Sequence, residues 1–338
     1  MGPDARSAAL SPRAGDPEDH HGRAGRGSRP RSRLRPKHED AVAGLVVAVD
    51  RGRYTCRVGD HEVVAMRARE LGRRGAVVGD RVALVGDVSA DPDRLARIVR
   101  IEDRASVLRR SADDDDPLER VIVANADQLV VVTALADPPP RPGLVDRCLV
   151  AAHDAGIDPL LCLTKADLAP PTDMTEIYGP AQVPAVVLGR HDGALDGLDA
   201  LRRRLEGRVS VLVGHSGVGK STLVNALVPG ANRRTGAVNV TTGRGRHTST
   251  SVVALPAGPD TLIIDTPGIR SFGLAHIDAG RLVAAFPELA PGTAQCPSDC
   301  DHLDPEVCAL DRWVGEGHAH PERLASLRHL LVARGAGD

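Results

Sequence analysis

Aromatic side chains are almost absent from this sequence. They make up 1% of its 338 residues, whereas hydrophobic residues as a whole make up 42%. We therefore expect cores built from Val, Leu, Ala and Ile rather than from stacked rings. No apolar run approaches the roughly 18 residues that a membrane span needs, and the N-terminus lacks the apolar core of a signal peptide. These two absences indicate a cytoplasmic protein that does not insert into membranes.

Lysine is also scarce. Only three of the 43 basic residues are lysine, namely Lys37, Lys165 and Lys220. A lysine ammonium is a compact charge on a flexible stem, and the planar guanidinium of arginine does not replace it. The retained lysines therefore indicate positions where that stem matters, and two of them lie in motifs described below. The formal net charge of -2 gives no global sign of a nucleic-acid-binding protein.

Residues 1–38 are rich in Gly, Pro, Ser and Arg and show almost no apolar periodicity. Such a composition buries too little apolar surface to fold, so we predict a disordered basic tail. Two interpretations stay open: a leader that only improves solubility, or a segment that holds phosphate groups loosely.

Short apolar runs separated by turn signals follow the tail. Regularly spaced short strands favour a small β-barrel over residues 39–107. Five strands in about 65 residues fit an RNA-binding oligonucleotide-binding (OB) barrel, although an SH3-like barrel gives a similar pattern. The expected strands are Ala41–Val49, Tyr54–Val58, Val63–Met66, Val82–Val85 and Ile98–Ile101.

The pattern of apolar residues changes after the acidic run Asp113–Asp116, which we interpret as a linker. Apolar strands of four to eight residues then alternate with helical stretches, which predicts an α/β domain with a parallel sheet over residues 108–275. Residues 276–338 are expected to form helices around a cluster of Cys and His. The predicted fold is therefore multidomain, with a β-barrel, a central α/β domain and a C-terminal α-helical domain.

Residues 214–221, Gly-His-Ser-Gly-Val-Gly-Lys-Ser, match the phosphate-binding pattern G-x-x-x-x-G-K-[ST]. They follow an apolar strand at Val209–Val213 and open a helix, which is the context that the motif requires. The glycines let backbone N–H groups turn toward phosphates, Lys220 reaches the β- and γ-phosphates, and the Ser221 hydroxyl ligates Mg²⁺. The expected nucleotide contacts are Gly214, His215, Ser216, Gly217, Val218, Gly219, Lys220, Ser221 and Thr222.

A second motif that we expect to contact the phosphates follows the predicted strand Thr261–Ile264. In its tetrapeptide Asp-Thr-Pro-Gly, Asp265 can hold Mg²⁺ through water and the Gly268 N–H can meet the γ-phosphate. The Gly- and Arg-rich segment before this strand has the composition of a loop that orders on binding nucleotide or RNA. Thr248 or Thr250 in that segment can ligate Mg²⁺, and the sequence does not separate them.

A phosphate loop does not select a base, but the tetrapeptide Thr164-Lys165-Ala166-Asp167 does, because it matches [NT]-K-x-D after a predicted strand. The Asp167 carboxylate can accept hydrogen bonds from the N1–H and the N2 amino group of guanine, a donor pair that adenine lacks. The Lys165 stem lies over the ring. Thr164, Lys165 and Asp167 therefore predict GTP or GDP as the ligand. An ATPase or small-molecule kinase is the alternative class, and Asp167 argues against it.

The order of these motifs is unusual, because the guanine motif precedes the phosphate loop and the switch. In ordinary GTPases it follows them, so the present order requires a circular permutation. The sheet can stay unchanged because strands pair in space and not by chain order. The switch then leads directly into the C-terminal region, and we expect the nucleotide state to be transmitted there.

Ile269 stands where Ras-like proteins usually carry a glutamine that orients the attacking water. A hydrophobic side chain cannot orient water, so intrinsic hydrolysis should be slow and should depend on a partner or on another side chain. His247 is our candidate for that side chain, and contact with RNA or solvent is the alternative role for it.

Three of the six cysteines lie close together near the C-terminus. Cys296, Cys300, His302 and Cys308 are the ligand set of a closed tetrahedral zinc site, which would be structural. A disulfide is the alternative, but a cytosolic location disfavours it. His318 and His320 could compete as ligands, although we expect them to be exposed.

The permuted order, the motifs GHSGVGKST, RHTST and DTPGIRSFGL, and the Cys/His cluster together resemble the ribosome small-subunit-dependent GTPase A (RsgA) family. The resemblance implies an OB domain, a circularly permuted GTPase domain and a C-terminal zinc domain. We expect a monomer with Mg²⁺ bound alongside GTP and one structural Zn²⁺ per chain.

The same resemblance implies a role in the late maturation of the small (30S) ribosomal subunit and contact with its 16S rRNA. It also implies that this subunit stimulates hydrolysis of GTP to GDP and phosphate. The alternative is an RNA-binding adaptor that uses GTP as a structural ligand without significant turnover.

Overall fold

The computed structural model describes residues 38–72, 75–89, 91, 94–110, 120–231, 252–267 and 272–335. The predicted basic tail lies outside these residues except for His38. Within the described part of the chain, none of the helices combines the length and apolar character needed to cross a bilayer.

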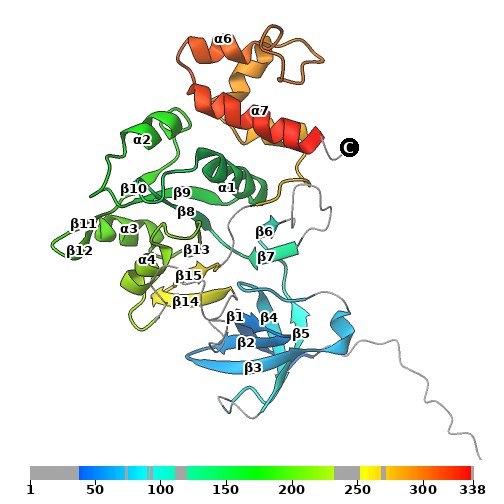
Figure 1. Cartoon of the computed structure of the whole chain (residues 1–338). Helices are drawn as coiled ribbons and strands as arrows, with labels where there is room; N and C mark the ends of the chain where they lie inside the picture. The colour runs from blue at the N-terminus through cyan, green and yellow to red at the C-terminus, as the bar shows by residue number, and fades with distance from the viewer. Residues whose placement is uncertain are drawn as a thin grey trace, which may run out of the picture. The chain divides into compact units, whose positions relative to one another are not determined.

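The first described residues form a closed five-stranded barrel (Figure 1). Strands β1 to β3 form antiparallel hairpins, β3 pairs in parallel with β5, and β4 pairs with both β5 and β1. The predicted barrel is therefore confirmed, and its strand order is that of an OB barrel rather than an SH3-like one. Its elements are β1 (Val42–Asp50), β2 (Arg53–Val58), β3 (His61–Arg67), the 3-10 turn η1 (Arg69–Leu71), β4 (Arg81–Gly86) and β5 (Ala96–Ile101).

Alternation along the barrel strands gives the barrel a buried inner face and an exposed outer face. In β3, Val63 and Ala65 are buried whereas Glu62 and Met66 are exposed, as expected when successive side chains point to opposite faces. The β1–β2 hairpin turns at Arg51 and Gly52, which both have positive φ (45° and 81°). Two such residues in a row give the turn whose twist matches that of paired strands.

The barrel is joined to the following domain by a short polar connection. Arg104 donates from Nε and Nη2 to the two carboxylate oxygens of Asp80, at 2.7 and 2.8 Å, and the Asp80 side chain is fully buried. Asn125 donates to the Gly79 carbonyl at 2.9 Å and accepts from the Ala105 N–H at 2.8 Å. These hydrogen bonds hold the connecting residues Arg104 and Asn125 against Gly79 and Asp80 of the barrel domain.

Six strands form the centre of the second domain, in the order β10-β9-β8-β13-β15-β14, and β14 continues the sheet into the barrel by pairing with β1 at Val253 and Ala48. Among these six, all neighbouring strands are parallel except the β14–β15 pair. The strand before the phosphate loop, β13, lies in the middle of the sheet although three of its strands precede it in the chain, as a permuted order requires. The strands are β8 (Gln128–Ala134), β9 (Asp158–Thr164), β10 (Ala185–Val187), β13 (Val209–Val213), β14 (Val253–Gly258) and β15 (Thr261–Asp265).

Helices cover both faces of this sheet, and the central strands are buried on both sides. In β8, Leu129 and Val131 pack into a core with α1, whereas Val130 and Val132 pack into a separate core with α3 and α4. The helices are α1 (Pro142–Ala155), α2 (Thr172–Tyr178), α3 (Leu198–Leu205) and α4 (Lys220–Leu227). The predicted α/β domain is thus confirmed.

Two small hairpins complete this part of the chain. Strands β6 (Val107–Arg110) and β7 (Arg120–Ala124) pair with each other, as do β11 (Gly189–His191) and β12 (Ala194–Asp196). The acidic run 113–116 lies outside the described residues, between β6 and β7. Our interpretation of this run as a linker therefore stays a prediction, while β6 and β7 on either side of it pair with each other.

The C-terminal part is helical, as predicted, and packs against the central domain through α1 and α7. The Asp278 side chain caps the first helix by accepting a hydrogen bond from the Arg281 N–H at 2.8 Å. The elements are α5 (Ala279–Ala284), the 3-10 helix η2 (Ala290–Gln295), α6 (Leu310–Gly315) and α7 (Pro321–Gly335).

Candidate functional site

The phosphate loop, residues 214–221, connects β13 to α4 at the carboxyl edge of the sheet. A Cβ on Gly214 would lie 2.5 Å from the Val132 carbonyl oxygen, so a side chain there would collide with the neighbouring strand. Gly219 has a φ of 92°, which side chains disfavour. The glycines thus allow the backbone to turn tightly before the helix begins at Lys220.

The two charged residues predicted to contact the phosphates and Mg²⁺, Lys220 and Asp265, lie together. The Lys220 ammonium pairs with the Asp265 carboxylate, which is 45 positions away in the chain, and their side chains are 12% and 5% exposed. The next residue, Thr266, donates from Oγ1 to the Leu212 carbonyl at 2.7 Å and holds the end of β15 against β13. Parallel neighbours β13 and β15 therefore present the predicted phosphate and magnesium contacts side by side.

The guanine motif lies beside the phosphate loop. Thr164 at the end of β9 donates from Oγ1 to the Val218 carbonyl at 2.7 Å, across 54 positions of sequence. Lys165 adopts a positive φ of 60°, and its ammonium donates to the carbonyl of Asp137. The two motifs that the sequence places far apart thus form one site.

A pocket of about 250 Å³ opens between the two motifs. Five of the predicted nucleotide contacts line it: Thr164, Lys165, Asp167, Gly219 and Thr222. The Asp167 Oδ1 accepts a hydrogen bond from the Arg190 N–H at 2.9 Å, which orients the carboxylate. Polar groups that converge in a partly apolar pocket are the usual pattern of a ligand site.

Four predicted residues are not tested by this geometry. His247, Thr248, Thr250 and Gly268 lie outside the described residues, and their roles stay predictions. His215 is described, and desolvation in the loop lowers its pKa from the ordinary value of 6.5. Its imidazole is therefore neutral at pH 7, and Lys220 supplies the positive charge of the loop.

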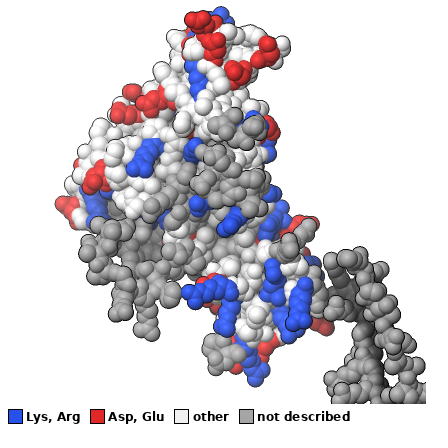
Figure 2. Space-filling view, turned by 45° about the vertical axis from the view of Figure 1, so that its right-hand side comes forward, with Lys and Arg blue, Asp and Glu red and all other residues white. Residues whose placement is uncertain are grey.

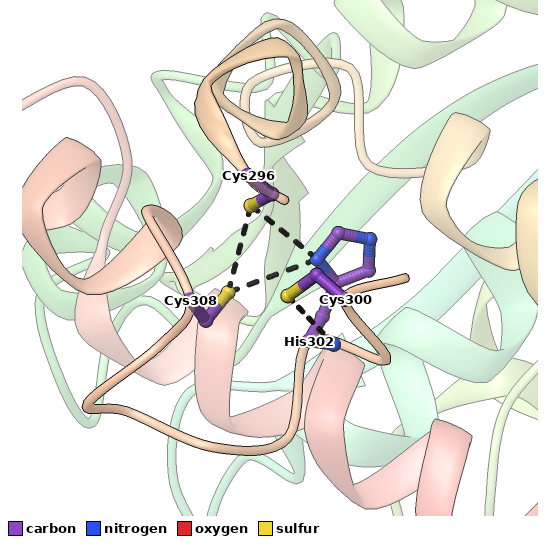
Figure 3. Close-up of side chains that lie close together, drawn as sticks. All are labelled: Cys296, Cys300, His302 and Cys308. Carbon is purple, nitrogen blue, oxygen red and sulfur yellow. Dashed lines mark hydrogen bonds between the residues drawn. The ribbon is translucent and has the colours of Figure 1, made fainter. Parts of the chain in front are cut away.

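A second site lies in the C-terminal part, where the side chains of Cys296, Cys300, His302 and Cys308 converge (Figure 3). Their ligand atoms all lie within 4.8 Å of one another. The Cys296 and Cys308 sulfurs are 3.9 Å apart, and each is 3.7 Å from the His302 Nδ1. The four side chains extend from one irregular segment between η2 and α6.

These distances fit a zinc ion and not a disulfide. Tetrahedral zinc places two sulfur ligands about 3.8 Å apart and a sulfur about 3.6 Å from a nitrogen, whereas a disulfide bond is about 2.05 Å long. Arg328 of α7 donates from Nε to the His302 carbonyl at 2.9 Å and from Nη1 to Asp311 at 2.9 Å. The helix thereby fixes the loop that carries the imidazole.

Burial changes the protonation of two members of this cluster. Burial raises the pKa of the Cys308 thiol to about 11, and burial lowers the pKa of His302. The imidazole is therefore neutral and able to ligate. The thiol needs a metal ion to displace its proton at neutral pH.

Comparison with known proteins decides the family. A family model described as RsgA GTPase matches residues 101–275. A relative from Gemmatimonas aurantiaca, named "Small ribosomal subunit biogenesis GTPase RsgA", is 39% identical over 264 residues, which cover 76% of this chain and 85% of the relative. The chain belongs to the RsgA GTPase family.

Another RsgA relative, from Ectopseudomonas mendocina (strain ymp), carries the same name and is 42% identical over 221 residues. That match covers 63% of this chain and 63% of the relative, so the chain spans less than two thirds of it. Among solved structures, YjeQ from Thermotoga maritima is similar in fold, with a TM-score of 0.67 and 24% identity over 87% of this chain and 98% of that one. YloQ, described as a circularly permuted GTPase, has a TM-score of 0.64 and 22% identity over 90% and 99%.

Part of the pocket between the two motifs was not recognised from the sequence of this RsgA-family chain. One wall follows the short strand β10 and is formed by residues that no motif indicates: Leu188, Gly189, Arg190 and Leu195. The available signal was the short apolar run 185–188, which could have been recognised as a further parallel strand ending at the same edge as β9. Its three-residue length hid it among loop residues.

If the cluster of Cys296, Cys300, His302 and Cys308 holds zinc in this RsgA-family chain, removing the metal should open the C-terminal part locally. Trp313, the single tryptophan, stacks on His318 at 3.9 Å and donates to the Glu288 carbonyl at 2.9 Å. A strong chelator should therefore shift Trp313 emission to longer wavelength. The Cys308→Ser variant should bind little zinc, whereas Cys56→Ser, a buried cysteine of the barrel, should retain it. Equal zinc content in the two variants would exclude the cluster.

Proposed function

We propose that this RsgA-family chain binds GTP and hydrolyses it to GDP and phosphate. The observation that carries the proposal is the hydrogen bond from Thr164 to the Val218 carbonyl, which joins the guanine motif to the phosphate loop around one pocket. A guanine motif and a phosphate loop that border one pocket suit a purine nucleotide, which presents both a base and phosphates. A smaller phosphate ester would leave the guanine motif without a ligand.

Each motif residue then has a role. Asp167 accepts from the guanine N1–H and N2 amino group while the Lys165 stem covers the ring. Lys220 and the loop N–H groups hold the β- and γ-phosphates. Mg²⁺, held by Ser221, by Asp265 through water and by Thr248 or Thr250, would neutralise charge that develops on the phosphates.

Hydrolysis itself needs a residue that positions water. Because Ile269 replaces the usual glutamine, intrinsic turnover is slow, and His247 together with a docked partner completes the site. The Gly268 N–H contacts the γ-phosphate. The partner is the small ribosomal subunit, consistent with the names of the curated relatives.

The barrel offers a surface for that partner. Its strands carry exposed arginines, namely Arg53, Arg67, Arg81, Arg97 and Arg100. Figure 2 shows basic side chains gathered over the barrel on this face, whereas acidic ones are frequent over the C-terminal helices. Exposed arginines gathered on one face of an OB barrel suit the phosphate backbone of 16S rRNA.

The remaining predictions complete the proposal. The chain divides into a basic tail (1–38), an OB domain (39–107), a permuted GTPase domain (108–275) and a zinc domain (276–338). One structural Zn²⁺ stabilises the last of these. The protein acts as a monomer in the cytoplasm, where it assists late maturation of the 30S subunit.

A competition experiment tests the choice of nucleotide. A fluorescent GDP bound to the protein should be displaced by GTP at concentrations at least about 100-fold lower than by ATP, because adenine leaves Asp167 without donors. The Lys220→Ala variant should lose binding of both nucleotides. Equal displacement by ATP would support the kinase or ATPase alternative instead.

A further inference from the structure

A second cavity lies at the edge of the sheet opposite the phosphate loop. It has a volume of about 860 Å³ and is bordered by Gln128 and Asp158, the first residues of β8 and β9. The nucleotide pocket lies at the carboxyl ends of parallel strands, and the two cavities share no lining residue. This cavity is therefore separate from the proposed GTP site, and we call it the arginine cavity.

Basic side chains dominate the polar lining of the arginine cavity. Arg203, Arg204, Arg208 and His153 line it, and Asp158 is the one carboxylate among the described lining residues. Asp158 is already paired with Arg208 at 2.8 Å. Arg203 and Arg204, at the end of α3, form no ion pair with any described residue. The cavity thus has an excess of positive charge.

A further lining residue, Arg323, does not add to that excess. Its guanidinium pairs with the buried carboxylates of Asp146 and Glu288. The charge that is available to a ligand therefore comes from α3.

Apolar surface accompanies these arginines. Leu149, Ile157, Val183 and Pro287 contribute to the lining of the same cavity. A purely ionic ligand such as free phosphate would leave this surface unused. A ligand with an anionic group and a flat, weakly polar body would contact both parts of the lining.

We propose that the arginine cavity binds a phosphate-bearing nucleotide ligand, with Arg203 and Arg204 on the phosphate. Guanidinium groups match phosphate oxygens in pairs, and they also stack on bases. The ligand is either a free nucleotide or a nucleotide of an RNA strand, since both present the same chemistry. The proposal goes beyond the GTPase function and does not depend on hydrolysis.

The position of the cavity gives such a ligand a structural consequence. Its lining combines the central domain, through α1 and α3, with Ala285 and Pro287 beside α5 and with Arg323 of α7. A bound nucleotide would therefore contact the central domain and the C-terminal helices at once.

The triplet Arg202-Arg203-Arg204 contains its own control for an experiment. Arg202 faces away from the cavity, because it pairs with Asp199 at 3.0 Å and donates to the Ala226 carbonyl at 3.0 Å. We would measure the fluorescence anisotropy of a labelled single-stranded RNA octamer and of a labelled adenosine nucleotide. The variants are Arg202→Gln, Arg203→Gln and Arg204→Gln, all in the full chain with excess GDP and Mg²⁺.

We expect Arg203→Gln and Arg204→Gln each to weaken binding of at least one probe by about fivefold or more, with Arg202→Gln unchanged. For RNA, each of these two substitutions should also weaken the dependence of the binding constant on salt concentration, by the amount that corresponds to about one phosphate contact. Loss with the adenosine nucleotide identifies free nucleotide as a ligand, and loss with RNA alone identifies a strand. Equal effects of all three substitutions, or none, would overturn the proposal. Neither outcome bears on GTP turnover, which is measured separately.

Discussion

Replacing Asp167 with asparagine should lower the affinity for GTP by about 100- to 1000-fold. The carboxylate offers two acceptor oxygens to the N1–H and N2 amino group of guanine, and each hydrogen bond to a charged group contributes about 1.5–3 kcal/mol. Since about 1.4 kcal/mol corresponds to a factor of ten, losing one bond and the charge gives a change of this size.

The same variant should gain affinity for xanthosine triphosphate. Xanthine carries a carbonyl oxygen where guanine carries its amino group, and the asparagine amide can donate to that oxygen while still accepting from N1–H. The amide oxygen can also keep the hydrogen bond from the Arg190 N–H, which lies 2.9 Å from Asp167. The fold should therefore be unaffected.

Isothermal titration with both nucleotides would measure this exchange. Asp173→Asn, a change to an exposed aspartate of α2, is the matched control and should leave both affinities as they are. An Asp167→Asn protein that still prefers GTP would show that Asp167 does not read the base.

Replacing Arg323 with alanine should reduce the free energy of unfolding by about 3–5 kcal/mol. The guanidinium is 1% exposed and pairs with Asp146 of α1 and with Glu288, which are 0% and 1% exposed. Removing the cation leaves two buried carboxylates without their partner. It also removes the contacts of the guanidinium with the rings of Phe286 and Tyr178, at 4.3 and 5.2 Å from their centroids.

Urea unfolding followed by Trp313 emission is a suitable measurement, because Trp313 donates to the carbonyl of Glu288. Arg208→Ala should cost about 0–1 kcal/mol, since its ion pair with Asp158 is exposed. Arg323→Lys should lie between the two, because an ammonium cannot reproduce a planar fork. A loss below about 1 kcal/mol for Arg323→Ala would contradict the role of this buried cation in joining α7 to α1.

The sequence predicts some elements well because motif and periodicity agree there. The strand Val209–Val213 has the predicted bounds and the helix Lys220–Leu227 follows the phosphate loop as predicted, since an apolar run, a glycine loop and a helix follow one another without ambiguity. The barrel strands lie within one or a few residues of their predicted positions because turn signals separate them.

Other elements could not be found from one sequence. The β6–β7 hairpin pairs across nine intervening residues, and β10 is three residues long. Short strands carry too little periodicity to be recognised. The buried pair Arg323–Asp146 joins positions 177 residues apart, and nothing local in the sequence indicates it.

The candidate site also has features that the sequence predicts and features that it does not. Each motif could be recognised alone, because Lys165 and Lys220 stand out in a chain with three lysines. The hydrogen bond from Thr164 to the Val218 carbonyl could not be predicted, since it depends on how β9 and the phosphate loop lie in the permuted sheet.

The central claim is that a ribosomal partner completes an otherwise slow GTPase. Its most direct test is phosphate release from GTP by the full chain, alone and with purified 30S or 50S subunits, in the presence of Mg²⁺. We predict slow release alone and with 50S subunits, and a rise of about 10-fold or more with 30S subunits, which disappears in Lys220→Ala. Release that is the same in all three conditions would contradict the account and favour the adaptor that binds GTP without turnover.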